Sequence, residues 1–153
     1  MSDEAISPHE LDQLIDALAD DEAFGEAKEL LTEYGQAHYP ELKQAIARAL
    51  QRHPSDQAED HAVTMELPWI LSDVIEDGDD LVEALQPFLQ GPNTGLIAIA
   101  MDVIVESGDP TLANVLAPLQ EDERWVVLRG VRKDYHVGAY AMGALDRLLF
   151  QRE

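Results

Sequence analysis

Apolar residues recur every three to four positions along most of this chain, a spacing typical of amphipathic α-helices. The first expected helix begins with Ser7-Pro8-His9-Glu10, which combines a capping serine, a proline suited to the first helical turn and a glutamate in the capping-box position. We expect this helix to end near Ala19–Asp20. Its apolar face consists of Leu11, Leu14, Ile15 and Leu18.

Two further helices are expected before residue 54. Asp21 can cap the second helix, and Gly35 is expected to end it, because glycine readily adopts the left-handed conformation that follows many helices. The third helix is expected from Pro40 to Arg52, and Pro54 prevents its continuation. The apolar positions are Phe24, Ala27, Leu30, Leu31 and Tyr34 in the second helix and Leu42, Ala45, Ile46, Ala49 and Leu50 in the third.

The middle of the chain is expected to form shorter helices. Ser55 can cap a segment that Pro68 must break or kink, since proline lacks the amide hydrogen that a helix interior requires. A short apolar piece around Trp69 follows, and Glu76-Asp77-Gly78-Asp79-Asp80 then serves as a turn and a helix cap. An amphipathic helix is expected from Leu81 to Gln90.

The most apolar run of the chain is TGLIAIAMDVIVESG, from Thr94 to Gly108. Its length exceeds that of a typical strand and falls short of the roughly 20 residues that cross a bilayer. Turn residues bound it on both sides, at Gly91-Pro92-Asn93 and Gly108-Asp109-Pro110. We therefore expect a helix that is buried on most of its circumference, with the other helices stacked on it.

Three elements are expected after residue 109. A helix follows Asp109-Pro110-Thr111, and the last helix is expected from Val137 to Phe150. Between them, Arg124–Tyr135 (RWVVLRGVRKDY) is compatible with either a strand or a helix. We favour a helix, because a single strand would have no pairing partner. The pattern therefore predicts one all-helical domain, residues 1–153, with about eight or nine short helices.

The last expected helix resembles the second helix of a HEAT-like repeat. That helix tends to read Val-Arg, two variable residues, Ala-Ala, one variable residue, Ala-Leu-Gly, one variable residue and an aliphatic residue. The chain is similar to this pattern at Val137, Ala141, Ala144, Leu145 and Leu148 and departs from it at Gly138, Met142 and Asp146. The turn Gly108-Asp109-Pro110 is also common before the first helix of such repeats.

Two other segments are similar in kind: the apolar run at 94–107 and the AIARAL stretch within Leu42–Arg52. Val103 and Leu145 are 42 positions apart, within the roughly 40–47 residues of one HEAT period, whereas Leu50 and Val103 are 53 apart. The resemblance implies a right-handed stack of antiparallel helix pairs, an α-solenoid. The alternative is a helical bundle without repeats.

The composition excludes several kinds of chemistry. The chain has no cysteine, so it forms neither disulfides nor thiolate metal sites. The N-terminal segment MSDEAISPHEL is acidic and lacks the basic and apolar regions of a secretory signal. No apolar run approaches the length of a membrane span, and we expect a soluble, cytoplasmic protein.

Acidic residues dominate the charge: 31 Asp and Glu against 10 Lys and Arg give a net charge of −21. Nucleic acids and anionic membranes bind through basic surfaces, so we expect neither as a direct partner. Residues 53–92 hold ten acids and no Lys or Arg, whereas residues 93–153 hold nine acids and six bases. This gradient favours an acidic face directed at a basic partner protein.

No catalytic or cofactor signature is present. The chain has no G-x-x-x-x-G-K, G-x-G-x-x-G, G-x-S-x-G or H-E-x-x-H motif, and we expect no enzymatic activity and no bound cofactor. His53 and His61 flank three acids, but we expect exposed histidines on a solvated helix rather than zinc ligands. The acidic run 76–80 fails the EF-hand template, because Ile75 and Ala84 stand where that template needs carboxylates.

The residues expected to bind the partner are the acids of the base-free segment together with Trp69, since tryptophan is enriched at binding hot spots. The alternative for Trp69 is a place in the core. The candidate set is Asp56, Glu59, Asp60, Glu66, Trp69, Asp73, Asp77, Asp79, Asp80 and Glu83. A second candidate surface comprises Trp125, Arg129, Arg132 and Lys133. It suits self-association, in which it would contact the acidic middle of another copy. The alternative is that its bases pair with the chain's own acids.

A small, acidic, cysteine-free helical protein without an active site resembles in type the immunity proteins that neutralise bacterial toxins, many of which are nucleases with basic clefts. The resemblance implies an inhibitor that associates rapidly through charge steering. A variant is a DNA mimic whose carboxylates are spaced like duplex phosphates. The alternative is a HEAT-like scaffold or adaptor whose acidity reflects a salt-rich host, which the seven arginines against three lysines also fit. An enzyme would need a deep pocket with two carboxylates of raised pKa.

Overall fold

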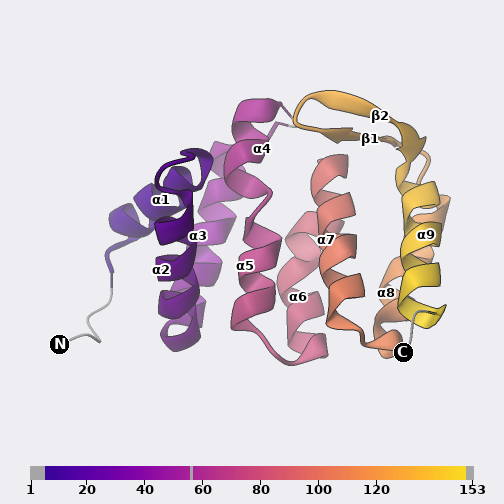
Figure 1. The fold of residues 1–153 in the computed structure, drawn as a ribbon, viewed down its shortest axis with the longest axis horizontal. Coiled ribbons are helices and arrows are strands. Elements are labelled where there is room, and N and C mark those ends of the chain that lie inside the picture. Colours follow the sequence, from indigo (N-terminus) through magenta and orange to yellow (C-terminus); the bar gives the residue numbers. More distant parts are fainter. Residues whose placement is uncertain (1–5, 56, 151–153) are drawn as a thin grey trace.

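The structure, a computed structural model, describes residues 6–55 and 57–150, and its helices stand side by side in a row with one hairpin across their ends (Figure 1). The helices are α1 (Pro8–Asp16), α2 (Phe24–Ala37), α3 (Tyr39–Arg52), α4 (Ala58–Thr64), α5 (Leu67–Val74), α6 (Gly78–Leu89), α7 (Thr94–Ser107), α8 (Ala113–Leu116) and α9 (Val137–Phe150). Short 3-10 segments cover Ala17–Ala19, Pro110–Leu112 and Ala117–Glu121, and the hairpin consists of β1 (Trp125–Leu128) and β2 (Val131–His136). The prediction of a mainly helical fold is confirmed.

The first helix begins as the sequence predicts. Ser7 Oγ accepts a hydrogen bond from the backbone N–H of Glu10 at 3.1 Å, and the Glu10 carboxylate accepts one from the Ser7 N–H at 3.2 Å. This reciprocal pair is a capping box, which satisfies amides that a helix start leaves without partners. Leu11 and Ile15 are buried, so the predicted apolar face is the one that packs.

The prediction that Gly35 ends the second helix is wrong, because α2 continues to Ala37. Gly35 is buried, and a Cβ atom at this position would lie 2.4 Å from Leu42 Cδ2 and 3.0 Å from Val74 Cγ2. The absence of a side chain therefore lets α2 approach α3 and α5 closely. This glycine serves the packing between helices rather than the termination of one.

The helix between α3 and α5 begins later in the chain than the sequence predicts. Ser55 does not cap the next helix: α4 begins at Ala58, and Ser55 Oγ accepts a hydrogen bond from the Gln57 N–H at 3.2 Å. Pro68 separates α4 from α5 as predicted, since it lies in the first turn of α5, where no intrahelical partner for an amide is needed.

The core forms around α7. Ten of its 14 residues are buried, and Gly108 ends it in the left-handed conformation with a φ of 71°. α7 contacts α5, α6, α9 and β1, and buried apolar residues from α1 to α9 form one cluster. The burial and the stop predicted for residues 94–108 are confirmed. Within the described part of the chain, no helix combines the length and the apolarity needed to cross a membrane.

The prediction of a helix over Arg124–Tyr135 is wrong, because the two halves of this segment pair with each other as antiparallel strands. Leu128 pairs with Val131, and the two residues between them, Arg129 and Gly130, have φ angles of 54° and 79°. Two successive positive φ angles mark a type I′ turn, whose twist suits a two-residue hairpin. The objection to a lone strand fails because each strand finds its partner within the same segment.

A buried histidine connects the hairpin to the helices. His61 is fully buried, so the prediction that it is exposed is wrong. Its Nδ1 accepts a hydrogen bond from the Arg129 N–H at 2.7 Å, and its Nε2 lies 2.6 Å from Asn93 Oδ1. With Nδ1 as the acceptor, Nε2 carries the proton and donates to Asn93. Both ring nitrogens are therefore satisfied while the ring is neutral, which makes its burial tolerable.

The first residues of α7 hold the other side of the hairpin. The Thr94 hydroxyl donates to the Trp125 carbonyl at 2.9 Å and accepts from the Val127 N–H at 3.0 Å. Next to it, a Cβ atom on Gly95 would lie 2.2 Å from the Val127 carbonyl oxygen. Only glycine at this position allows the strand to lie directly on the helix.

Candidate protein-binding surface

The acidic candidates fall into two groups at opposite ends of α5 (Figure 1). The first group consists of Glu59 and Asp60 on α4 and Glu66, which directly precedes α5. The second group, at the edge formed by the α5–α6 turn, consists of Asp73, Asp77, Asp79, Asp80 and Glu83. Asp56 lies outside the described residues. The fold therefore does not gather the base-free segment into one acidic cluster.

Two members of the first group are held by partners within the chain. Asp60 Oδ2 accepts hydrogen bonds from the Ser55 N–H at 2.9 Å and the Ser55 hydroxyl at 2.7 Å. The Ser55 hydroxyl, above all, holds the pKa of Asp60 below its usual value in spite of partial burial. Glu66 Oε1 lies 3.3 Å from Lys28 Nζ. These two carboxylates stabilise the fold and offer little free charge to a partner.

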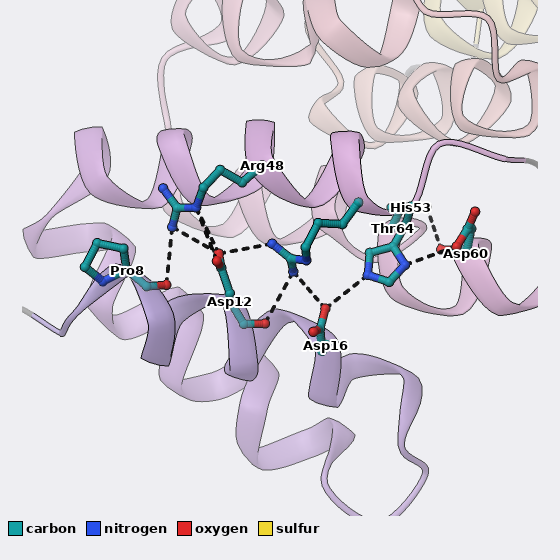
Figure 2. Close-up of polar contacts among 8 residues, drawn as sticks. Pro8, Asp12, Asp16, Arg48, His53, Asp60 and Thr64 are labelled. Carbon is teal, nitrogen blue, oxygen red and sulfur yellow. Dashed lines mark hydrogen bonds and ion pairs between the residues drawn. The ribbon is translucent and has the colours of Figure 1, made fainter.

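Further acids are neutralised where α1 meets α3 (Figure 2). Asp12 Oδ1 lies 3.0 Å from Arg48 Nη2 and 3.2 Å from Arg52 Nη1, and Asp16 Oδ1 lies 2.8 Å from Arg52 Nη2. His53 continues this network, with Nε2 3.1 Å from Asp16 Oδ1 and Nδ1 3.1 Å from Asp60 Oδ1. We name this network the charge clasp; its members are Asp12, Asp16, Arg48, Arg52, His53 and Asp60.

His53 links α3 to both α1 and α4 in the charge clasp. Because an ionised carboxylate only accepts hydrogen bonds, His53 makes both bonds only when both of its ring nitrogens carry protons. Its side chain is 22% exposed, so the prediction of an exposed histidine is wrong here as well. Burial by itself raises the pKa of Asp12, but Arg48 and Arg52 outweigh it, and the pKa of Asp12 lies below its usual value.

The carboxylates at the start of α6 are in a different situation. Asp77 caps the helix, with Oδ1 accepting from the Asp79 N–H at 2.8 Å and the Asp80 N–H at 3.4 Å. Asp79, Asp80 and Glu83 are exposed, and their side chains have no hydrogen bond or ion pair with any other described residue. The N-terminal end of a helix favours negative charge, which helps to explain how these acids are tolerated so close together.

A cavity of about 300 Å³ lies between the end of α2, the start of α3 and the α5–α6 turn. Four carboxylates line it, from Glu76, Asp77, Asp80 and Glu83, and Lys43 is the only basic residue in its lining. The other lining residues are Gly35, Gln36, Tyr39, Val74 and Ile75. We name it the acidic cavity.

The pKa of the Tyr39 hydroxyl reflects the negative potential of the acidic cavity. Partial burial raises the pKa of the Tyr39 hydroxyl above its usual value, and the charges of Glu83 and Asp80 raise it further. Tyr39 begins α3, whereas both acids belong to α6, so only the tertiary fold brings them within electrostatic reach. The field that disfavours a tyrosinate here favours a cation.

The carboxylates surround this cavity without converging on one point. Among residues 6–55 and 57–150, no group of three or more His, Cys, Asp or Glu side chains is placed to hold a metal ion. A guanidinium group spreads its positive charge over a fork of N–H donors, and dispersed carboxylates suit it better than they suit a compact ion.

Trp69 does not join the acidic cavity. It is half-buried and packs against the core, as the alternative stated for it predicts. The cavity instead includes Tyr39, Lys43 and Glu76, which are absent from the candidate set. Glu76 could have been added from its position in the acidic run. Nothing in the sequence indicates that Tyr39 and Lys43, on α3, lie opposite the start of α6.

Comparison of the chain with protein-family models, with curated proteins and with solved structures yields no match. The geometry and charge of the residues themselves therefore have to carry the inference about function.

Proposed function

We propose that this protein is a non-enzymatic protein-binding module whose acidic cavity receives basic side chains of a partner protein. The observation that carries the proposal is a cavity lined by four carboxylates beside the aromatic ring of Tyr39; two of these carboxylates, Asp80 and Glu83, form no hydrogen bond or ion pair with any described residue. An arginine in this cavity donates charge-assisted hydrogen bonds to the carboxylates and makes a cation–π contact with the ring.

The most specific form of this proposal is an immunity-type inhibitor that blocks a basic, nuclease-like protein. The net charge of −21 draws such a partner in from a distance and speeds association. A DNA mimic is the less favoured variant, because a mimic needs an extended row of free carboxylates. Here the acids of the middle segment are interrupted, because Asp60 and Glu66, which lie between Glu59 and the acids of the α5–α6 turn, are bound within the chain.

We also propose that the row of helices is a HEAT-like α-solenoid. In its favour, consecutive helices stand side by side, and α7 packs against both α6 and α9 (Figure 1). The hairpin between α8 and α9 is a departure from a plain stack of helix pairs. The alternative fold is a non-repeat bundle. The alternative function, a scaffold with a host-adapted acidic surface, gives the acidic cavity no specific role.

Binding of a nona-arginine peptide, measured by isothermal titration calorimetry, tests the proposal. Reversal of two cavity charges in the double variant Asp80→Lys and Glu83→Lys replaces attraction with repulsion at the site. We expect the peptide to bind this variant at least about tenfold more weakly than the unaltered chain.

A matched control separates the site from the net charge. Glu22→Lys with Glu26→Lys changes the net charge by the same amount, but Glu22 precedes α2 and Glu26 lies in its first turn, whereas Gly35 and Gln36 of the cavity lie near its end. We expect the affinity of this control to change by less than about threefold. If the two double variants lose the same affinity, the peptide senses only net charge and the proposed site is wrong.

A further inference from the structure

The hairpin carries basic residues that have no acidic partner. In the described part of the chain, Lys28, Arg48, Arg52, Arg124 and Arg147 all form ion pairs with carboxylates. Arg129, Arg132 and Lys133 of the hairpin form no such pair with any described residue. Arg132 is exposed and Lys133 is half-buried, whereas Arg129 is exposed but lines a hollow that Asp21 and Glu66 also line. Arg132 is therefore the most available of the three charges.

An exposed aromatic and an exposed aliphatic residue accompany these charges. Trp125 is 39% exposed and Val131 is 56% exposed, both among the most exposed large apolar residues of the described chain. The Arg132 guanidinium lies 4.4 Å from the centre of the Trp125 ring. We name Trp125, Val131, Arg132 and Lys133 the hairpin patch; Asp134 is the one acid within the hairpin strands. Tryptophan and arginine together are the residues most enriched at binding hot spots.

The hairpin patch and the acidic cavity lie at opposite edges of the row of helices (Figure 1). The hairpin crosses one end of the helices, and the α5–α6 turn that borders the cavity lies at the other end. Their charges are opposite, yet the rigid helices between them prevent them from meeting within one molecule. They can meet only between molecules.

We propose that the hairpin patch docks into the acidic cavity of a second copy of this chain. The proposal rests on the function proposed above, because it names the hairpin as one basic ligand of that same cavity. The volume of about 300 Å³ accommodates the end of one long basic side chain. Arg132 or Lys133 enters beside Asp80 and Glu83, and Trp125 packs against the rim.

This contact uses two different surfaces, so it is heterologous and leaves a free patch on one copy and a free cavity on the other. Further copies add to both ends, and the assembly is an open row rather than a closed dimer. The net charge of −21 on every copy opposes this growth, which keeps the rows short and the association concentration-dependent. A free cavity at one end of each row stays available to another basic partner.

Sedimentation velocity over a range of protein concentrations, at about 0.15 M salt to screen distant charges, tests the proposal. Two neutralised variants are compared with the unaltered chain: a patch variant, Arg132→Gln with Lys133→Gln, and a cavity variant, Asp80→Asn with Glu83→Gln. We expect the unaltered chain to form dimers and longer species as its concentration rises. We expect each variant alone to stay monomeric at concentrations at least about tenfold higher.

The mixture of the two variants gives the decisive result. The patch variant keeps an intact cavity and the cavity variant keeps an intact patch, so an equimolar mixture restores one contact and no more. We expect a one-to-one dimer that does not grow. Restoration of long species, or a mixture that stays monomeric, overturns the heterologous contact; so does an unaltered chain that is monomeric at every concentration.

The nona-arginine titration separates failure of this inference from failure of the proposed function. The patch variant retains the acidic cavity, and we expect it to bind the peptide with unchanged affinity. Peptide binding without self-association leaves the cavity function standing and overturns the hairpin as its ligand. Self-association that persists in the cavity variant, while peptide binding is lost, places the contact elsewhere and also overturns it. Circular dichroism of each variant confirms that the fold is intact.

Discussion

The charge clasp and the acidic cavity both contain acidic side chains, but only those of the clasp form ion pairs within the described chain. In the clasp, Asp12 and Asp16 lie within 3.2 Å of arginine nitrogens, and His53 bridges two carboxylates. At the cavity, Asp80 and Glu83 are exposed and meet no base among the described residues, although Lys43 lines the same cavity. One set of acids connects helices; the other set forms no ion pair with any residue that the structure describes.

The difference shows that the number of acids in a segment does not tell how much charge a partner meets. Residues 53–92 contain no Lys or Arg, yet Asp60 is bound by His53 within this segment and Glu66 by Lys28 from outside it. Intramolecular neutralisation removes these acids from the accessible field. Among the described acids of this segment, those that remain are Glu59 on α4 and the acids around the α5–α6 turn.

The largest effect on stability is expected from the clasp. Asp12→Ala removes the carboxylate that Arg48 and Arg52 share, so both arginines lose this ion pair where α1 contacts α3. The Asp12 side chain is 26% exposed, so solvent screens part of the interaction, and we expect a loss of about 2 kcal/mol in the free energy of unfolding. Urea denaturation followed by circular dichroism measures it.

Asp80→Ala is the matched control for the clasp variant. It removes the same carboxylate from an exposed site without a partner, and we expect the free energy of unfolding to change by less than about 0.5 kcal/mol. Equal losses for Asp12→Ala and Asp80→Ala would contradict the distinction between the two regions.

A smaller effect is expected from salt. Salt should weaken peptide binding at the acidic cavity more than it weakens the stabilisation by the charge clasp. Raising sodium chloride from about 0.05 M to 0.5 M shortens the screening length roughly threefold, and we expect nona-arginine to bind about tenfold more weakly. The stability difference between the unaltered chain and Asp12→Ala should change far less, because contacting, partly buried charges are screened less. Absence of peptide binding together with strong stabilisation at molar salt would instead favour host adaptation.

The helical part of the fold could be predicted because its signals are local. The capping box at Ser7 and the apolar run that ends at Gly108 depend on residues within a few turns of one another. The hairpin was missed because its turn is Arg129-Gly130 rather than the usual Asn-Gly or Asp-Gly, and a positive φ at Arg129 cannot be inferred from residue type. Gly35 was misassigned because its role depends on Leu42, on another helix.

The candidate site could be predicted only in part, for the same reason. Composition drew attention to the acids from Asp77 to Glu83, of which Asp77, Asp80 and Glu83 line the cavity. It could not separate them from Asp60, whose partners are set by the loop before α4. Nor could it place Tyr39 beside them, or show that His61 is buried, since both facts follow from packing between distant segments.

The smallest effect is expected from acid, and its sign follows from the lowered pKa of Asp12. A carboxyl whose pKa is lower in the folded than in the unfolded state stabilises the fold above the unfolded value, about 3.9 for aspartate, and loses this contribution as the pH falls through the folded value. We therefore expect the unaltered chain to exceed Asp12→Asn by about 1 kcal/mol in the free energy of unfolding between pH 5 and 7. Below about pH 4 the difference should shrink and then vanish.

Urea titrations of both proteins from pH 7 to pH 2 measure this difference directly. Taking the difference between two variants cancels the general relief of repulsion that acid brings to a chain of net charge −21. Asp146→Asn is the control, because Asp146 is exposed and forms no ion pair with any described residue, and its difference from the unaltered chain should stay small throughout. A difference for Asp12→Asn that persists unchanged to pH 2 would show that the clasp stabilises through packing and not through the charge of Asp12.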